Sequence, residues 1–179
     1  MTAFISGGCK NGKSFYAQRL ARHWARGGPL FYIATMEPKD KEDLARVARH
    51  RKERDGWGFE TLEWGRDLLG HWRREPRKGA LLLDSVTALL ANEMFGPEGT
   101  VNDKAGEIVA ASLSTLEKEA EHVVFVSDYL YSDAALYDPL TEAYRKNLAL
   151  VDRTLARQCD VVLEACAGLV LSHKGGLPL

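Results

Sequence analysis

The stretch Gly7-Gly8-Cys9-Lys10-Asn11-Gly12-Lys13-Ser14 matches the phosphate-loop pattern G-x-x-x-x-G-K-[ST] at every fixed position. The apolar run Ala3–Ser6 precedes it, and apolar residues at helical spacing follow it. A strand before the loop and a helix after it form the context in which this pattern binds phosphate, which argues against a chance glycine-rich turn. The stretch therefore predicts a strand–loop–helix unit that holds the phosphates of ATP or GTP.

The fixed residues of this loop have distinct chemical roles. Glycines let the backbone curl tightly enough to point successive N–H groups at phosphate oxygens, and the following helix begins with its positive dipole end nearby. Lys13 is expected to reach the β- and γ-phosphates, and the Ser14 hydroxyl is expected to ligate Mg²⁺. Cys9 is expected to contribute only its backbone.

Beyond the loop, short apolar runs alternate with longer amphipathic stretches. The expected strands are Ala3–Ser6, Leu30–Ala34, Leu81–Asp84, Val123–Ser127 and Val161–Cys166, with a weaker run at Phe59–Leu62. The expected helices are one containing Tyr16–Trp24, then Lys41–Arg54, Asp67–Arg74, Val86–Phe95, Lys104–Glu121 and Pro139–Gln158. Nearly uninterrupted apolar runs are typical of parallel strands covered on both faces. The pattern predicts an α/β fold with a mainly parallel sheet flanked by helices in three layers.

Length and composition limit the possible classes of protein. A chain of 179 residues with 45% apolar and 27% charged residues is expected to form one nucleotide-binding domain over residues 1–179, with Gly96–Asn102 as a surface loop. The net charge of -1 argues against nucleic acid as the main partner. The three cysteines contain no C-x-x-C pair, which indicates reduced thiols in the cytoplasm. No apolar run approaches the ~18 residues that a membrane span needs.

A carboxylate ends one of the expected buried strands, in Leu81-Leu82-Leu83-Asp84. Such a group at the C-terminal end of a strand can hold Mg²⁺ through its water shell, or it can simply cap the following helix. Beside a phosphate loop, the magnesium role is the favoured interpretation of Asp84.

The predicted helix Lys41–Arg54 is unusually basic. Arg46, His50 and Arg54 recur at helical spacing and share one face, with other cations around them. Like charges at this spacing repel one another, so a bound anion nearby would explain the choice. Neighbouring cations also disfavour the imidazolium form, which leaves His50 neutral and nucleophilic at pH 7.

Two interpretations of this helix stay open. In the first, His50 attacks the α-phosphate of a nucleotide and forms a phosphoramidate, while the cations stabilise the transferring group. In the second, which the charge pattern alone favours, the helix is a solvated basic surface and His50 is incidental. The other histidines have no comparable setting and are expected to be structural or surface residues; they are His23, His71, His122 and His173.

Several segments, taken together, are similar to a known family. They are Ser6–Gly8, Gly12–Ser14, Tyr32–Thr35, Arg46–Arg51, Arg54, Trp57, Thr61–Glu63 and Leu83–Thr87. The strand that ends in threonine and the Arg/His helix are not general properties of phosphate-loop proteins. The sequence resembles the bifunctional adenosylcobinamide kinase/adenosylcobinamide-phosphate guanylyltransferases of cobalamin biosynthesis.

This resemblance implies a RecA-like phosphate-loop fold in a cytosolic homo-oligomer that acts on a nucleotide and a corrinoid. Such enzymes phosphorylate the aminopropanol hydroxyl of adenosylcobinamide, then transfer GMP from GTP to that phosphate. His50 would carry the guanylyl group as a covalent intermediate, with Lys13 and Asp84 also catalytic and Ser14 and Asp84 holding Mg²⁺. Beyond the phosphate loop, the implied nucleotide-binding residues are Ala34, Thr35, Met36, Arg51, Lys52, Glu53, Arg54, Glu63 and Asp84.

The second half of the chain departs from the family pattern. Where members carry Asn-Glu-Val-Gly after the fifth strand, this chain has Ser127-Asp128-Tyr129-Leu130. The later Asn-Gln pair is Asp152-Arg153, and the C-terminal Ser-Gly-Ile-Pro stretch is Ala167-Gly168-Leu169-Val170. Asp128 either replaces the family's acidic residue as base or metal partner, or caps a loop.

Three functions therefore stay open. The first is the family activity through guanylyl-His50. The second is a small-molecule phosphate-loop kinase that uses only Lys13, Ser14 and Asp84 and leaves His50 idle. The third is a regulatory protein that binds GTP without chemistry.

Overall fold

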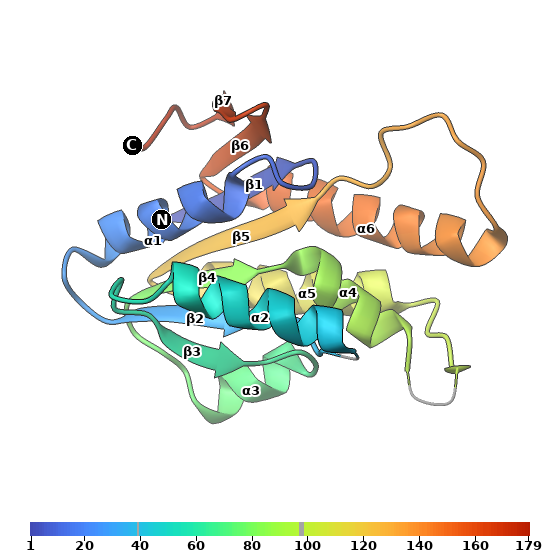
Figure 1. Cartoon of the computed structure of the whole chain (residues 1–179), viewed down its shortest axis with the longest axis horizontal. Coiled ribbons are helices and arrows are strands. Elements are labelled where there is room, and N and C mark those ends of the chain that lie inside the picture. Colours follow the sequence, from blue (N-terminus) through green and yellow to red (C-terminus); the bar gives the residue numbers. More distant parts are fainter. Residues whose placement is uncertain (39, 97–98) are drawn as a thin grey trace.

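The computed structural model describes residues 1–38, 40–96 and 99–179, and the side chains of Arg46 and Glu53 also lie outside the description. Strands and helices alternate along the chain (Figure 1). The strands are β1 (Thr2–Gly7), β2 (Leu30–Ala34), β3 (Glu60–Glu63), β4 (Ala80–Asp84), β5 (His122–Asp128), β6 (Val161–Cys166) and β7 (Leu169–Lys174). The helices are α1 (Lys13–Ala25), α2 (Lys41–Glu53), α3 (Leu68–Arg74), α4 (Val86–Met94), α5 (Ala105–Glu119) and α6 (Pro139–Gln158).

The strands form one sheet in the order β3-β2-β4-β5-β1-β6-β7. Its pairings are parallel except that of β6 with β7, which is antiparallel. In the register of the sheet, Gly7 lies opposite Asp128 and Ala34 lies opposite Asp84. Because parallel strands end at the same edge, the phosphate loop after β1 meets the acidic ends of β4 and β5 there.

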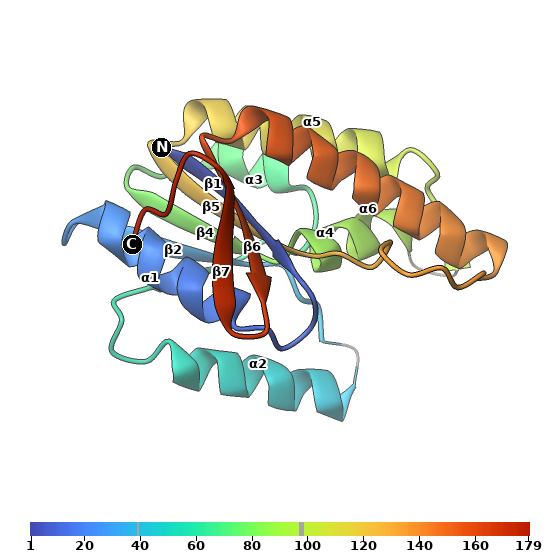
Figure 2. The same cartoon turned by 90° about the horizontal axis from the view of Figure 1, so that it is seen from above.

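Helices cover both faces of this sheet (Figures 1 and 2). On one face, α1 packs over alternate strand residues such as Ile5 and Val126. On the other face, α3, α4, α5 and α6 pack around residues such as Phe4 and Phe125. The predicted three-layer α/β architecture is confirmed. Among the described residues, no helix combines the length and the apolar character needed to cross a membrane.

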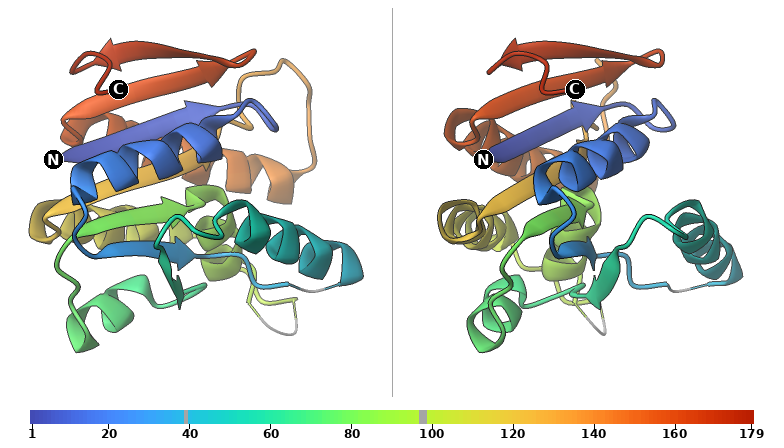
Figure 3. Two further views of the ribbon diagram at one scale, coloured as in Figure 1. Left: turned by 60° about the vertical axis from the view of Figure 1, so that its left-hand side comes forward. Right: turned by 90° about the vertical axis from the view of Figure 1, so that its left-hand side faces the viewer.

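Helix α2 takes a different position from the other helices. It follows β2 beyond the C-terminal edge of the sheet and lies apart from the strands (Figures 2 and 3). Asp40 fixes its start, because the Asp40 carboxylate accepts a 2.8 Å hydrogen bond from the backbone N–H of Asp43. Leu44 is 57% exposed, so the helix buries little of its apolar stripe.

The predicted elements agree with the observed ones to within two residues at each end, except that α1 begins at Lys13, three residues before the predicted Tyr16–Trp24 stretch. The strand β7 was not predicted, because the expected strands ended with Val161–Cys166. Ala167 and Gly168 have φ angles of 49° and 80°, which make a two-residue hairpin turn and return the chain beside β6. In the predicted loop Gly96–Asn102, Val101 forms a bridge with Phe95, while residues 97–98 lie outside the described part of the chain.

Candidate nucleotide-binding site

The phosphate loop leads directly into α1. Gly12 has a φ of 83°, a left-handed conformation that a residue with a β-carbon adopts only at a cost, and α1 begins at the next residue, Lys13. The Lys13 ammonium donates a 2.9 Å hydrogen bond to the carbonyl oxygen of Gly8 and forms an ion pair with Asp128. The lysine is therefore folded back over the loop, where a phosphate would bind.

A cavity of about 930 Å³ opens over this loop. Its wall includes loop residues from Cys9 to Ser14, together with side chains from α2, β4 and β5. These side chains include His50, Asp84 and Asp128. The volume lies in the range of small-molecule sites, and the wall places the imidazole and two carboxylates around the space that phosphates would fill.

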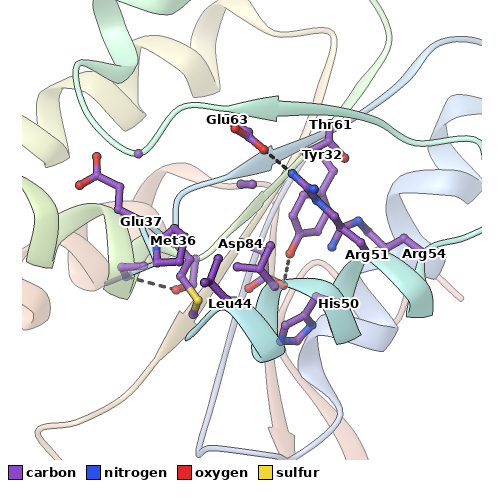
Figure 4. Close-up of a pocket in the computed structure, with 16 residues that line it drawn as sticks. Tyr32, Met36, Glu37, Leu44, His50, Arg51, Arg54, Thr61, Glu63 and Asp84 are labelled. Carbon is purple, nitrogen blue, oxygen red and sulfur yellow. Dashed lines mark hydrogen bonds and ion pairs between the residues drawn. The ribbon is translucent and has the colours of Figure 1, made fainter. Parts of the chain in front are cut away.

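A second cavity, of about 410 Å³, adjoins the first (Figure 4). Met36, His50, Asp84 and Ser85 line both cavities, so this group of residues forms their common border. The second cavity is also lined by Tyr32, Ala34, Leu44, Val47, Arg51, Arg54, Thr61 and Glu63. It combines apolar walls with two guanidinium groups and the carboxylates of Glu37, Glu63 and Asp84, a mixture that suits a base and a ribose.

Asp84 is held in place at this border by Tyr32. The Tyr32 hydroxyl donates a 3.0 Å hydrogen bond to the Asp84 carboxylate (Figure 4). The pKa of Asp84 is raised above its ordinary value, mainly because the carboxyl group is buried. Hydrogen bonds from Tyr32 and Ser14 and the nearby imidazole of His50 act in the opposite direction. The carboxylate thus has a hydroxyl of the phosphate loop on one side and the imidazole close by.

Two arginines at the C-terminal end of α2 line the second cavity and contact neighbouring strands. Arg54 is 6% exposed, and its guanidinium carbon lies 3.5 Å from the centre of the Tyr32 ring. Arg51 forms an ion pair with Glu63 of β3, and both side chains are exposed (Figure 4). These contacts connect the helix that carries His50 to the strands β2 and β3.

An aromatic contact also ties the turn after α2 to the loop helix. The rings of Trp57 and Phe15 meet edge to face with centroids 5.7 Å apart, and Arg22 lies over Trp57 at 5.5 Å. Phe15 directly follows Ser14, and Trp57 lies shortly after the C-terminal end of α2. The contact therefore connects that end of α2 to the start of α1 beside the phosphate loop. His50, one turn before this end of α2, lines the larger cavity.

Most of the predicted site residues line one or both cavities. Cys9, Lys10, Asn11, Gly12, Lys13, Ser14, Met36, His50 and Asp84 line the larger cavity, and Ala34, Arg51, Arg54 and Glu63 line the smaller one. Gly7, Gly8, Thr35 and Lys52 are not among the lining residues, and the side chain of Glu53 lies outside the described part of the chain.

Thr35 has a structural role in this conformation. It is fully buried, and its hydroxyl donates to the carbonyl oxygen of Ser85 and accepts from the Ser85 N–H, both at 2.7 Å. It therefore ties the end of β2 to the end of β4. The direct nucleotide contact that the resemblance implies for Thr35 stays a prediction.

Two residues of the site were not among the predicted site residues. Tyr32 lies two positions before Ala34, and the alternation of a strand puts both on the face that carries Asp84. Asp128 was considered as a base, a metal partner or a loop cap, and its position opposite Gly7 brings it to Lys13. Strand alternation could have identified Tyr32, whereas the position of Asp128 depends on the strand order.

Comparison with known proteins adds to this geometry. Residues 3–173 match the protein family described as "Cobinamide kinase / cobinamide phosphate guanyltransferase". The chain belongs to this family. The "Bifunctional adenosylcobalamin biosynthesis protein CobP" of Pseudomonas aeruginosa is 30% identical over 176 residues, covering 98% of each chain. The corresponding CobU protein of Escherichia coli is 31% identical over 96 residues, which are 53% of this chain and 51% of that one.

The family membership predicted from the sequence is thereby confirmed, and with it the class of kinase and nucleotidyltransferase enzymes. Among solved structures, the flagellar accessory protein FlaH of Methanocaldococcus jannaschii superposes with a TM-score of 0.52 at 14% identity. That similarity covers 97% of this chain and 77% of FlaH. At this identity the similarity shows a shared overall fold and nothing about the chemistry of this chain.

Proposed function

We propose that this member of the cobinamide kinase family phosphorylates the aminopropanol hydroxyl of adenosylcobinamide and then transfers GMP from GTP to that phosphate. The observation that supports the proposal best is the position of His50, which lines both the phosphate-loop cavity and the adjoining cavity. A histidine at this border can reach the α-phosphate of a nucleotide whose base and terminal phosphates occupy the two cavities.

The two cavities suit the two ends of a nucleoside triphosphate. The larger cavity has the phosphate loop and Lys13 for the β- and γ-phosphates. The smaller cavity has Glu63, whose carboxylate can accept hydrogen bonds from the N1–H and amino groups of guanine. Arg51 and Arg54 line the same space and can pair with phosphate or ribose oxygens. We therefore place the nucleoside in the smaller cavity.

Guanylyl transfer would then take place in two displacements. An imidazole nitrogen of His50 attacks the α-phosphorus of GTP, the bond from that phosphorus to the bridging oxygen breaks, and pyrophosphate leaves. A phosphate oxygen of cobinamide phosphate next attacks the same phosphorus, and the phosphorus–nitrogen bond breaks. The GMP group passes to the acceptor and His50 is regenerated. Lys13 stabilises the charge that develops on the phosphates.

The oxygen donors at the loop fit Mg²⁺. Ser14 and Asp84 line the same cavity, and Ser14 lies close enough to hydrogen bond with the Asp84 carboxylate. In the described part of the chain, no group of three or more His, Cys, Asp or Glu side chains is arranged to hold a metal. Mg²⁺ that is bound mainly through phosphates and water needs only one or two protein ligands, and we propose Ser14 and Asp84. When bound, the ion would neutralise phosphate charge.

Other properties that the resemblance implied stay proposals. They are the homo-oligomeric state and the location in the cytoplasm. The phosphate donor of the kinase step is ATP or GTP, and the guanylyl donor is GTP.

Labelling with GTP that carries ³²P at the α-phosphate tests the central step. The wild-type protein is expected to acquire label that survives alkali and is lost in acid, as phosphoramidates behave. The variant His50→Ala should acquire none. His23→Ala is the matched control, because His23 is exposed on α1 and lines neither cavity.

Three results would argue against the proposal. Label that persists in His50→Ala would place the intermediate elsewhere. Absence of label in the wild type, with phosphoryl transfer to an alcohol, would indicate a kinase that leaves His50 idle. Nucleotide binding without either reaction would indicate a regulatory protein.

A further inference from the structure

Asp128 is a carboxylate of the phosphate-loop cavity that guanylyl transfer does not use. It ends β5, lies opposite Gly7 in the parallel register and lines the larger cavity but not the smaller one. Its backbone N–H donates a 2.9 Å hydrogen bond to the Thr87 hydroxyl, which fixes its main chain. Its carboxylate forms an ion pair with Lys13. It is therefore a rigidly placed anion beside the lysine that binds the terminal phosphates.

The exposure of the two paired side chains differs. The Lys13 side chain is 8% exposed and the Asp128 side chain is 27% exposed, so the carboxylate is the partner that can be reached from the cavity. A nucleotide that binds Lys13 through its β- and γ-phosphates takes over the ammonium. The ion pair between Asp128 and Lys13 would then be weaker, and the Asp128 carboxylate would lie beside the γ-phosphate.

We propose that Asp128 is the general base of the kinase reaction and accepts the proton of the acceptor hydroxyl. This inference rests on the proposed function and decides between the roles of base, metal partner and loop cap that the sequence left open. In the step, the acceptor oxygen forms a bond to the γ-phosphorus of ATP while the bond from that phosphorus to the β–γ bridging oxygen breaks. The hydroxyl proton passes to the Asp128 carboxylate, and ADP leaves.

The division of the cavities supports this assignment over Asp84. Asp84 lies at the border with the nucleoside cavity, hydrogen bonds with Tyr32 and is placed to hold Mg²⁺. Asp128 lies on β5, which is next to β1 and its phosphate loop and one strand nearer to it than the β4 strand of Asp84, and it borders only the phosphate cavity. An acceptor that approaches the γ-phosphate therefore meets Asp128 at the end of the nucleotide remote from its base.

The variant Asp128→Asn separates a base from a residue that merely positions Lys13. The asparagine side-chain oxygen can still accept a hydrogen bond from the Lys13 ammonium, but the amide cannot take a proton. Asp103→Asn is the matched control, because Asp103 is exposed in the α4–α5 connection and lines neither of the two cavities. Each protein is assayed for phosphorylation of adenosylcobinamide by ATP and Mg²⁺, and for labelling of His50 from α-labelled GTP.

Asp128→Asn is expected to lower kcat for phosphorylation by about 10²- to 10³-fold, with KM for ATP changed by less than about fivefold. The loss in phosphorylation should exceed any loss in His50 labelling by at least about tenfold. Asp103→Asn should behave as the wild type in both assays. Asp128→Glu, which restores a carboxylate, should recover part of the lost phosphorylation rate.

Several results would overturn this role. A kcat within about threefold of wild type would exclude a base at this position. A loss that raised Mg²⁺ concentrations restore would assign Asp128 to the metal, and equal losses in both reactions would assign it to holding Lys13. Failure of the wild type to phosphorylate the acceptor would overturn the kinase half of the proposed function itself, and the base with it.

Discussion

The Tyr32 hydroxyl donates a 3.0 Å hydrogen bond to Asp84 from the neighbouring strand of the sheet. The Tyr32 ring also lies beneath the guanidinium of Arg54, which follows the helix that carries His50. One tyrosine therefore contacts both the carboxylate between the two cavities and the C-terminal end of α2.

Tyr32→Phe is expected to lower kcat for both reactions by about tenfold, because it removes the hydrogen bond that orients Asp84 and keeps the ring under Arg54. Steady-state kinetics with ATP and with GTP would measure the change. Tyr137→Phe is a suitable control, since the Tyr137 hydroxyl bonds to Asp133 in the β5–α6 connection. Equal effects of the two substitutions would contradict the role given to Tyr32.

Lys13→Ala is expected to reduce phosphorylation and His50 labelling by at least about 10²-fold, because both reactions need the same cation on the terminal phosphates. The change also leaves the Asp128 carboxylate without this partner. Rates measured at saturating nucleotide would detect the loss. Turnover retained at the wild-type rate in either reaction would remove the phosphate loop from that reaction.

Glu63→Gln should weaken binding of GTP relative to ATP by about tenfold, since a carboxylate is the better acceptor for the guanine N–H groups. Competition of each nucleotide against a labelled analogue would give the ratio. Glu60→Gln on the same strand is the control, because Glu60 is exposed, pairs with Arg77 and lines neither cavity. An unchanged preference in Glu63→Gln would place the guanine elsewhere.

Gly12→Ala is expected to cost about 1 kcal/mol of folding stability, since its φ of 83° is left-handed. Gly27→Ala is closely matched, with a φ of 84° and, as at Gly12, no atom within 4 Å of an added β-carbon. Urea unfolding should therefore give similar losses for the two variants. Nucleotide affinity should fall only in Gly12→Ala, and a loss of equal size in Gly27→Ala would show that general destabilisation explains it.

The buried Asp152 on α6 makes folding stability depend on pH. It is 2% exposed, and its carboxylate accepts a 2.9 Å hydrogen bond from the Tyr131 hydroxyl. Burial raises the pKa of Asp152 from 3.8 to about 7, while interactions with Ser127 and Tyr131 act in the opposite direction. Between these two pH values, the folded state keeps a proton that the unfolded chain has released, so this group destabilises the fold as pH rises through the window.

Asp152→Asn should remove that dependence, because the amide stays neutral at every pH. Relative to the wild type, the variant should gain roughly 2–4 kcal/mol of stability on going from about pH 4 to pH 8. Urea denaturation at both pH values would measure the gain, with Asp103→Asn as the control that keeps the wild-type slope. A gain near zero would mean that the pKa of the Asp152 carboxyl in the folded protein is the same as in the unfolded chain.

The sequence predicted the centre of the sheet and the phosphate loop because these depend on local patterns. Apolar runs locate strands such as Leu30–Ala34, and the glycine pattern locates the start of α1. The hairpin to β7 was overlooked, although Ala167-Gly168 between two apolar runs is a turn signal that could have been read.

The composition of the site was harder to predict because it depends on contacts between distant segments. Nothing local to Asp128 indicates Lys13 as its partner, since 115 positions separate them and only the neighbouring places of β1 and β5 bring them together. Thr35 has a role that the sequence also does not reveal. The family resemblance implied a nucleotide contact for Thr35, and the structure adds two hydrogen bonds between its hydroxyl and the main chain of Ser85, which only the strand order brings together.

The shared wall between the two cavities limits the order of events. The described part of the chain has one phosphate loop, and His50 and Asp84 line both the cavity over that loop and the adjoining cavity. A phosphate donor and a guanylyl donor would thus compete for the same binding site. Catalysis by one copy of the chain would alternate between them, and an excess of either triphosphate would slow the step that needs the other.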